Sequence, residues 1–592
     1  MLFKPTSKIR GVRALAVGLL SLGTIVSFAA PPRTLVDLAR EGKRDSVIAA
    51  ITSPDVDVNV KSPDGATSLM WAISNNDMEL ARALLKAGAK ANVINNYGAS
   101  ALSEAIKQND LDMVRTLLDA GADVNSPGTD NQTALLLAIS VGPQAQKIAE
   151  LLIQRGADVN AIETFRGQNP LMWAAAGNMP DIVDQLIAKG AVNVNMRAKA
   201  DDWARMVTSE PRAQFGSRHS GGLTALLYAT RSGCLRCAQS LVKAGADIEK
   251  PNPDGVTPLI NALDGGKYDV ANFLLDQGAN PNTWDMHGRT PIYSAVDRKA
   301  AAGAGGGPGG RAGGRGTGTP GAAGAAGGRG AGPGGPGAGG PPGAAATRAP
   351  TTPAVAPMVV INRLLDMGVD VNHQLTRKRP YDQGRQRFTD YDMRGGVGPL
   401  FVATINSDPE SIEALIKHGA EVDLVNVFQM TPLMYAAGMR GTSRAGGAAG
   451  AGAGDRAFKA LDILLAAGAN INAQVTDSHT HTAVLMAYVA GRDQEGRTAL
   501  MANAENGNEK MVSYLLDHGA DPTLKDEKGI TALDLARLPP DEKAKLEDRE
   551  RTIATRAATA KVLEAELTRR GIAIPPASPP ATTPAVPVAT AK

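Results

Sequence analysis

A spacing of 33 residues recurs along the chain and constrains its fold more strongly than any other feature of the sequence. Residues 254–286 show the unit most clearly. Thr257 is a residue type favoured at a helix N-cap, and Pro258 suits the first helical position. Gly278 follows a second apolar helix pattern, where a left-handed residue commonly ends a helix. A unit this small cannot bury its own apolar face, so the sequence predicts that neighbouring units stack.

The cap and the terminating glycine repeat in phase along most of the chain. The residues equivalent to Thr257 are Thr67, Ser100, Thr133, Asn169, Thr224, Thr290, Gly398, Thr431, Thr498 and Thr531. The glycines equivalent to Gly278 are Gly88, Gly121, Gly156, Gly190, Gly245, Gly368, Gly419, Gly468, Gly519 and Gly571. Because every residue at the first position belongs to the set preferred at N-caps, each unit is predicted to contain a pair of helices.

Four short motifs carry a resemblance to a known family. They are Thr257-Pro258-Leu259, Thr290-Pro291-Ile292, Thr431-Pro432-Leu433 and Gly121-Ala122-Asp123-Val124-Asn125. With the spacing, they resemble the ankyrin repeat family over roughly residues 33–572. The resemblance implies an all-α solenoid of about twelve helix–turn–helix repeats, joined by extended, β-hairpin-like fingers.

One position departs from the family's T-P-L-H motif. Its fourth residue is mostly apolar here, as in Met70, Ile260 and Met434, although Asp534 stands there in one unit. We therefore expect apolar contact to replace a polar network between repeats.

Composition and spacing divide the chain into repeats and inserted segments. The predicted segments are a signal peptide at 1–29, repeats at 33–299, a Gly-, Ala-, Pro- and Arg-rich loop at 300–357 inserted within a repeat, further repeats at 358–572 with a Gly/Ala-rich insert at 441–454, and a Pro-, Ala- and Thr-rich tail at 573–592. The loop and the tail lack the apolar periodicity needed to bury surface, so we expect both to be disordered.

The N-terminus has the pattern of an export signal. Basic residues from Lys4 to Arg13 precede an apolar run at 14–26, and small residues allow cleavage after Ala29. The pattern predicts an exported protein, periplasmic or extracellular. An uncleaved N-terminal anchor is the alternative, and no other stretch is long and apolar enough to cross a membrane.

Three fingers are longer than the reference. From Gly278 to Thr290 is 12 residues, whereas the corresponding distances after Gly190, Gly368 and Gly468 are 34, 30 and 30 residues. The added segments mix aromatic residues and arginines, as binding surfaces do. Either they recognise a partner or they fold back on their own stack.

Finger residues are the predicted protein-binding anchors. They are Tyr97, Phe165, Arg166, Trp203, Arg205, Phe215, Trp284, Met286, Arg385, Phe388, Tyr391 and Phe428. The arginines, together with Arg387, would pair with carboxylates of the partner.

Cys234 and Cys237 are the only cysteines and form a C-x-x-C pattern. Haem attachment would need histidine next, but residue 238 is alanine. Zinc would need two further ligands, and none is near in sequence. A structural disulfide and two small core residues both remain open. A redox pair is the weaker rival, because the thioredoxin-like sequence context is missing.

Histidines suggest two further sites. His479 and His481 share a face of an extended segment, where they either chelate a metal or belong to a polar hairpin. His418 and His518 occupy the same repeat position, just before Gly-Ala, where a cation suits a helix C-terminus. We interpret this second pair as structural.

Nothing in the sequence supports catalysis. The chain has no G-x-S-x-G, H-E-x-x-H or Walker pattern, and its net charge of +3 is small for 592 residues. We therefore expect a monomeric, non-catalytic protein-binding scaffold without cofactors, whose partner is a protein and not a nucleic acid. The alternatives are a secreted effector acting on another cell and a redox accessory using Cys234 and Cys237.

Overall fold

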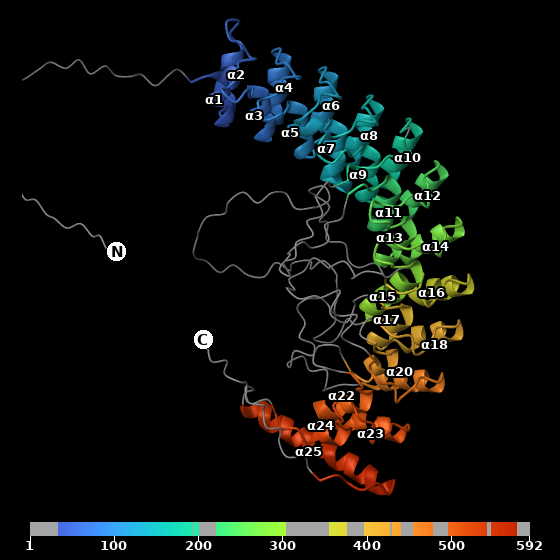
Figure 1. Cartoon of the computed structure of the whole chain (residues 1–592). Helices are drawn as coiled ribbons and strands as arrows, with labels where there is room; N and C mark the ends of the chain where they lie inside the picture. Colours follow the sequence, from blue (N-terminus) through green and yellow to red (C-terminus); the bar gives the residue numbers. More distant parts are fainter. Residues whose placement is uncertain are drawn as a thin grey trace, which may run out of the picture.

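The chain is an array of helix pairs arranged along an arc (Figure 1). This is a computed structural model. It describes residues 33–191, 193–200, 221–303, 355–375, 396–426, 429–439, 454–476, 495–540 and 546–576, with no side-chain detail at 300–303. The predicted signal at 1–29 and most of the predicted loop, insert and tail lie outside these residues. No helix among them is both long and apolar enough to span a membrane.

The first helix of each pair lies on the inner side of the arc (Figure 1). These helices are α1 (Leu35–Arg40), α3 (Ser68–Ser74), α5 (Ala101–Lys107), α7 (Ala134–Val141), α9 (Pro170–Ala176), α11 (Ala225–Ser232), α13 (Pro258–Asp264), α15 (Pro291–Gly303), α17 (Pro399–Ile405), α19 (Pro432–Ala436), α22 (Ala499–Asn506) and α24 (Ala532–Ala536).

The second helices form the outer layer. They are α2 (Arg44–Ile51), α4 (Met78–Lys86), α6 (Leu111–Asp119), α8 (Gln146–Gln154), α10 (Pro180–Ala188), α12 (Leu235–Lys243), α14 (Tyr268–Asp276), α16 (Pro357–Asp366), α18 (Pro409–Lys417), α20 (Asp455–Ala466), α23 (Glu509–Asp517) and α25 (Leu546–Arg569). Two short 3₁₀ turns, at Thr129–Asn131 and Pro143–Ala145, flank α7.

The predicted cap residues begin the inner helices. In α13, the Oγ1 atom of Thr257 accepts the N–H of Ile260, and Pro258 takes the first helical position. Most equivalent helices have the same side-chain cap, whereas Gly398 at the start of α17 has no side chain to supply it. The cap satisfies an N–H that the helix itself leaves without a partner.

Glycine ends the outer helices because the chain turns through the left-handed region there. Gly278 has φ 85°, and a Cβ at this position would meet nothing within 4 Å. The glycine is therefore required by backbone conformation and not by crowding. The N–H of Ala279 returns to the carbonyl of Leu274 at 3.0 Å and closes the end of α14.

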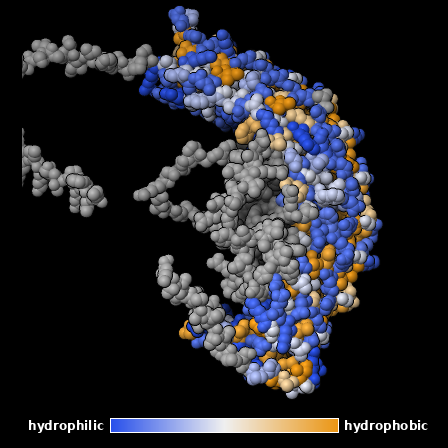
Figure 2. Space-filling view, in the orientation of Figure 1, coloured by the Kyte–Doolittle hydropathy of each residue, from blue (hydrophilic) through white to orange (hydrophobic). Residues whose placement is uncertain are grey.

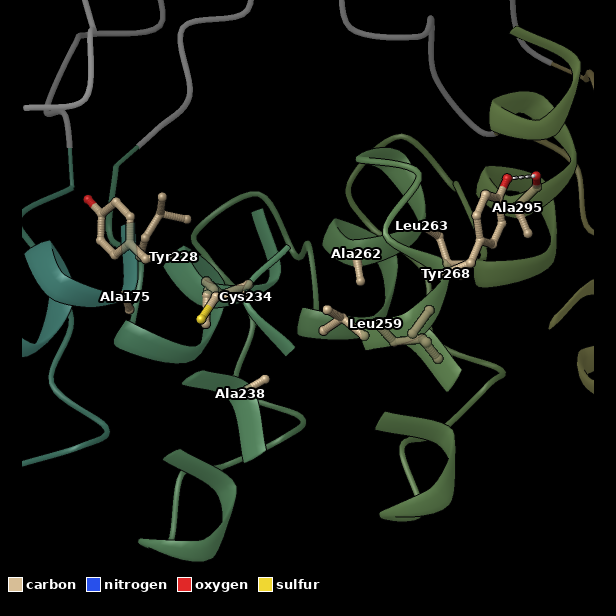
Figure 3. Packing of buried hydrophobic residues seen from close by; sticks show 14 of the residues in the cluster. Ala175, Tyr228, Cys234, Ala238, Leu259, Ala262, Leu263, Tyr268 and Ala295 are labelled. Carbon is tan, nitrogen blue, oxygen red and sulfur yellow. Dashed lines mark hydrogen bonds between the residues drawn. The ribbon is translucent and has the colours of Figure 1, made fainter. Parts of the chain in front are cut away.

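One continuous apolar core runs between the two layers. Leu259, Leu263 and Leu274 are fully buried in the reference unit, and Tyr268 reaches the carbonyl of Ala295 in the next unit (Figure 3). Each unit thus completes its core with its neighbours, which confirms the predicted all-α solenoid. The residues described contain isolated β-bridges but no strand, so their fingers are not β-hairpins.

Apolar side chains occupy the fourth motif position, as predicted. Met70, Ile260 and Met434 are all buried. Ser103 and Asp534 differ, because their side chains accept the backbone N–H groups of Ser100 and Thr531 and complete capping boxes. A short polar side chain at this position reaches back to the cap instead of entering the core.

Helix boundaries differ from the predicted limits of the 300–357 loop. α15 continues to Gly303, because the alanines that follow Lys299 favour a helix, and Pro357 already begins α16. A larger difference lies at the C-terminal end. The 19 extra residues in the last repeat are not filler, since they belong to the 24-residue helix α25, which packs against α22, α23 and α24.

Candidate functional site: the finger edge

Asparagine side chains join each finger to the next repeat. The Asn125 side chain donates to the carbonyl of Gly156 at 3.2 Å and accepts the N–H of Asp158 at 2.7 Å. Asn92, Asn195, Asn372 and Asn472 make the same two bonds to their next repeats. The asparagine of the G-A-D-x-N motif therefore fixes the spacing between fingers, a role that the sequence pattern alone did not reveal.

Polar side chains also shape the tip of each finger. The carboxylate of Asp285 accepts the N–H groups of His287 and Arg289, both at 2.9 Å. Asn95 does the same for Tyr97 and Ala99. These bonds replace backbone partners that a tight turn leaves unpaired, so the tips have a defined conformation.

Backbone hydrogen bonds connect one tip to the next. Asn96 donates to Asp64, Thr164 donates to Asp130, and Met286 donates to Asp254, at 2.8 to 2.9 Å between N and O. The close approach requires glycine at Gly98, where φ is 77° and a Cβ would lie 2.8 Å from the N atom of Thr129. The tips therefore form an ordered edge along the array.

Three predicted aromatic anchors are exposed on this edge. The exposed fractions are 74% for Tyr97, 58% for Phe165 and 61% for Trp284. Arg166 lies over the ring of Phe165, with 5.7 Å from Cζ to the ring centroid. Trp284 stacks on His373 at 5.5 Å between centroids. Met286 is half-buried beside Trp284.

The other predicted anchors lie outside the described residues. They are Trp203, Arg205, Phe215, Arg385, Arg387, Phe388, Tyr391 and Phe428, and so are His479 and His481.

The three long fingers begin and end in the same way. Leu375 and Val475 each donate to the residue before a cap, Val397 and Arg497, and accept an N–H from Gly396 and Gly496. Ala198 likewise donates to Leu223 at 3.0 Å.

A side chain fastens each of these bases to the following finger. Gln374 and Gln474 donate to Val425 and Lys525, and Arg197 donates to Pro251 at 2.6 Å. The additions therefore leave from a conserved geometry of the finger base, within one chain, and do not disturb the stacking.

Sequence reasoning missed two exposed isoleucines on the same edge. Ile94 is 37% exposed and Ile162 is 44% exposed, each a few residues before a cap. Their fingers are bridged by the intervening one, since Thr129 donates to the carbonyl of Tyr97 and Asn131 to that of Ile162, both at 2.7 Å. An aliphatic residue where most units are polar was the available signal.

Burial and charge give one strong ion cluster near the edge. Arg289 contacts Asp264 at 2.5 Å and Asp285 at 2.6 Å, and all three side chains are largely buried. Burial tends to lower the pKa of Arg289, but the two carboxylates outweigh it and raise the pKa. The cluster ties the tip turn to the end of α13 and is structural.

Cys234 and Cys237 are joined as a disulfide at the start of α12. Cys234 Sγ also accepts the N–H of Cys237 at 3.1 Å, which is the position of a helix cap. Both residues are buried (Figure 3), so the pair offers no accessible sulfur for redox exchange. Among the described residues, no group of His, Cys, Asp and Glu could hold a metal ion.

His418 and His518 lie at the C-terminal ends of α18 and α23. Each Nδ1 atom is 2.7 Å from a helix carbonyl, of Ala414 and Tyr514 respectively. Each Nε2 faces an aspartate of the preceding unit, Asp366 at 3.3 Å or Asp462 at 3.9 Å. This geometry supports the structural interpretation of the pair.

Comparison with known proteins agrees with this architecture. A family model described as "Ankyrin repeats (3 copies)" matches residues 35–128, 125–198, 164–252, 205–285, 226–302 and 456–538. A similar curated protein is the B-cell lymphoma 3 protein homolog of Mus musculus, which is 34% identical over 128 residues. That match spans 22% of this chain and 23% of the relative. The match does not fix the repeat number, so the count of about twelve stays a prediction.

Proposed function

Because this chain belongs to the ankyrin repeat family, we propose that it is a non-catalytic scaffold that binds another protein along its finger edge. Ankyrin repeats commonly mediate protein–protein interaction, and the family is generally non-catalytic. The observation that carries the proposal is the exposure of Tyr97, Phe165 and Trp284 on hydrogen-bonded tips. Exposed aromatic side chains on an ordered backbone give apolar contact at a small cost in conformational entropy.

The scaffold is proposed to act outside the cytoplasm, in the periplasm or the extracellular space. The N-terminal pattern that ends at Ala29 supports export, and a disulfide between Cys234 and Cys237 suits an oxidising compartment. The burial of that disulfide argues against the redox accessory considered above.

Site-specific photo-cross-linking tests the binding surface. A photoreactive residue at Tyr97 or Phe165 should give a discrete protein adduct in cells, whereas one at exposed Lys86 on the outer helix α4 should not. Equal labelling from all three positions, or none from the two tips, would contradict the finger edge as the binding surface. Fractionation of the same cells tests export, because recovery with the cytoplasmic fraction alone would contradict it.

A further inference from the structure

We propose that the tips of four successive fingers, from Tyr97 to Lys199, bind an extended peptide segment of a partner that carries acidic residues beside apolar ones. The surface is defined by Ile94, Tyr97, Ile162, Phe165, Arg197 and Lys199. The proposal rests on the scaffold function above and adds the chemistry and the direction of its ligand.

Continuity is the first argument. The bonds from Thr129 to Tyr97 and from Asn131 to Ile162 join three tips, and Lys199 adds the fourth by donating its N–H to Arg166 at 2.7 Å. Neighbouring helix pairs lie about 8–10 Å apart, so four tips span about 30 Å. An extended segment of about nine residues covers that length.

Apolar character marks one end of this surface. Ile94, Tyr97, Ile162 and Phe165 account for four of the five large apolar side chains that are exposed on described fingers, and the fifth is Trp284. Hydrophilic residues cover most of the face seen in Figure 2, so a group of exposed apolar residues is a local feature. Such groups mark interaction sites when the surrounding surface is polar.

Charge marks the other end. Arg197 and Lys199 are exposed, and they donate to the carbonyls of Pro251 and Thr164 at 2.6 and 2.5 Å. Within the described part of the chain, neither cation forms an ion pair with a carboxylate. By contrast, Arg44 and Arg236 each pair with two carboxylates of another helix.

The acidic residue closest in sequence to these tips is already used. Glu163 is buried, and its carboxylate accepts the N–H groups of Phe165, Arg166 and Gln168. Asp130, which is exposed one finger earlier, carries negative charge toward the apolar end. A ligand is therefore complementary when its acidic residues face Arg197 and Lys199 and its apolar residues face Tyr97 and Phe165.

Fluorescence anisotropy with two defined peptides tests this assignment on the full chain. One labelled peptide of about nine residues has Leu and Phe in one half and Glu in the other, and its counterpart has Lys in place of Glu. The acidic peptide should bind at least about tenfold more tightly, and the variant R197Q/K199Q should lose about that factor. The variant Y97S/F165S should also weaken binding, because it removes the apolar anchors.

Matched variants elsewhere control for general charge and aromatic content. Trp284→Ser removes another exposed fingertip aromatic and Lys86→Glu reverses an outer charge, and both should leave peptide affinity within about twofold. Equal affinity for the two peptides, no binding of the acidic one, or no effect of R197Q/K199Q would overturn the acidic ligand. Tighter binding of a labelled single-stranded oligonucleotide, dependent on the same two cations, would overturn it in favour of a nucleic acid.

Failure of this inference is distinguishable from failure of the scaffold function. If the peptides fail while Tyr97 and Phe165 still cross-link to a protein, the finger edge binds a partner of different chemistry. If neither peptide binding nor cross-linking occurs, the proposed function fails as well.

Discussion

At the scale of single residues, the cap threonines determine where each inner helix begins. Thr257 is buried, and its hydroxyl oxygen accepts the N–H of Ile260 at 3.4 Å. Asp110 caps the outer helix α6 in the same way. These contacts are local, which is why the sequence alone predicted them.

Replacing Thr257 separates the hydrogen bond from the backbone preference. Thr257→Ala should lower the free energy of unfolding by about 1 kcal/mol, whereas Thr257→Gly should cost only a few tenths of that. Alanine loses the cap acceptor and disfavours the extended backbone, while glycine loses only the acceptor. Urea unfolding of the purified chain measures both, and equal losses from the two variants would contradict this explanation.

Residues with long-range roles were harder to predict. The ladder asparagine Asn125 is present in the repeat motif, but its partners Gly156 and Asp158 lie 31 and 33 residues away. Similarly, the pattern of Cys234 and Cys237 left a disulfide and core packing open, and the structure combines the two. Spacing identifies residue types, whereas partner identity depends on how the repeats stack.

At the scale of helices, the outer row is held by buried leucines. Leu274 of α14 is fully buried between the layers. Leu274→Ala should lower the free energy of unfolding by about 2–5 kcal/mol, because it leaves a cavity in a packed core. Leu274→Met keeps the volume and should cost less than about 1.5 kcal/mol. Similar losses from the two variants, measured by urea unfolding, would show that this position is not tightly packed.

The terminal helix α25 was the main error of sequence reasoning. Its buried residues Thr559, Ala560, Leu563 and Leu567 are largely confined to its second half, and the mean hydropathy pattern over the full helix is weakly amphipathic. An insert that breaks the 33-residue spacing carries no positional signal, so its helix could not be assigned from the period. Its role as the cap of the stack follows only from its contacts with α22, α23 and α24.

An ion pair at the end of α25 gives a prediction about pH. Glu566 accepts hydrogen bonds from Arg569 and Arg570 at 2.6 and 2.5 Å. The bond from Arg569, with that from Arg570, lowers the pKa of Glu566 to about 2 from the ordinary value of 4.5. A carboxylate whose pKa is lowered in the folded state adds stability above the ordinary value and loses it as pH falls toward the lowered one.

Glu566→Gln should therefore weaken the docking of α25 at neutral pH, and the difference from wild type should shrink below about pH 4.5 and vanish near pH 2. Hydrogen exchange of α25 amides at several pH values measures it, after correction for the intrinsic pH dependence of exchange. The matched variant Glu547→Gln, at an exposed residue of the same helix, should show little change. A difference that grows toward acid would contradict the assignment.

At the scale of the whole molecule, stability comes from contacts between neighbouring repeats. The repeat that contains the 300–357 insert is held on both sides without it. Lys299 of α15 pairs with Asp408 at 2.5 Å, and Arg363 of α16 pairs with Asp276 at 2.6 Å. Val355, just before α16, donates its N–H to Asp269 at 2.7 Å. The contacts that place α15 and α16 are thus made by residues outside 304–354.

Replacing residues 304–354 with a Gly/Ser linker of about ten residues should consequently leave the midpoint of thermal unfolding almost unchanged, because a longer flexible loop adds only a small closure entropy. Lys299→Ala in the same chain serves as the contrast, since it leaves the buried carboxylate of Asp408 without its cation and should lower the midpoint. Differential scanning calorimetry compares the two changes. A large loss from the loop replacement would show that 304–354 packs on the array, and the solenoid would then depend on a segment that its repeat pattern does not contain.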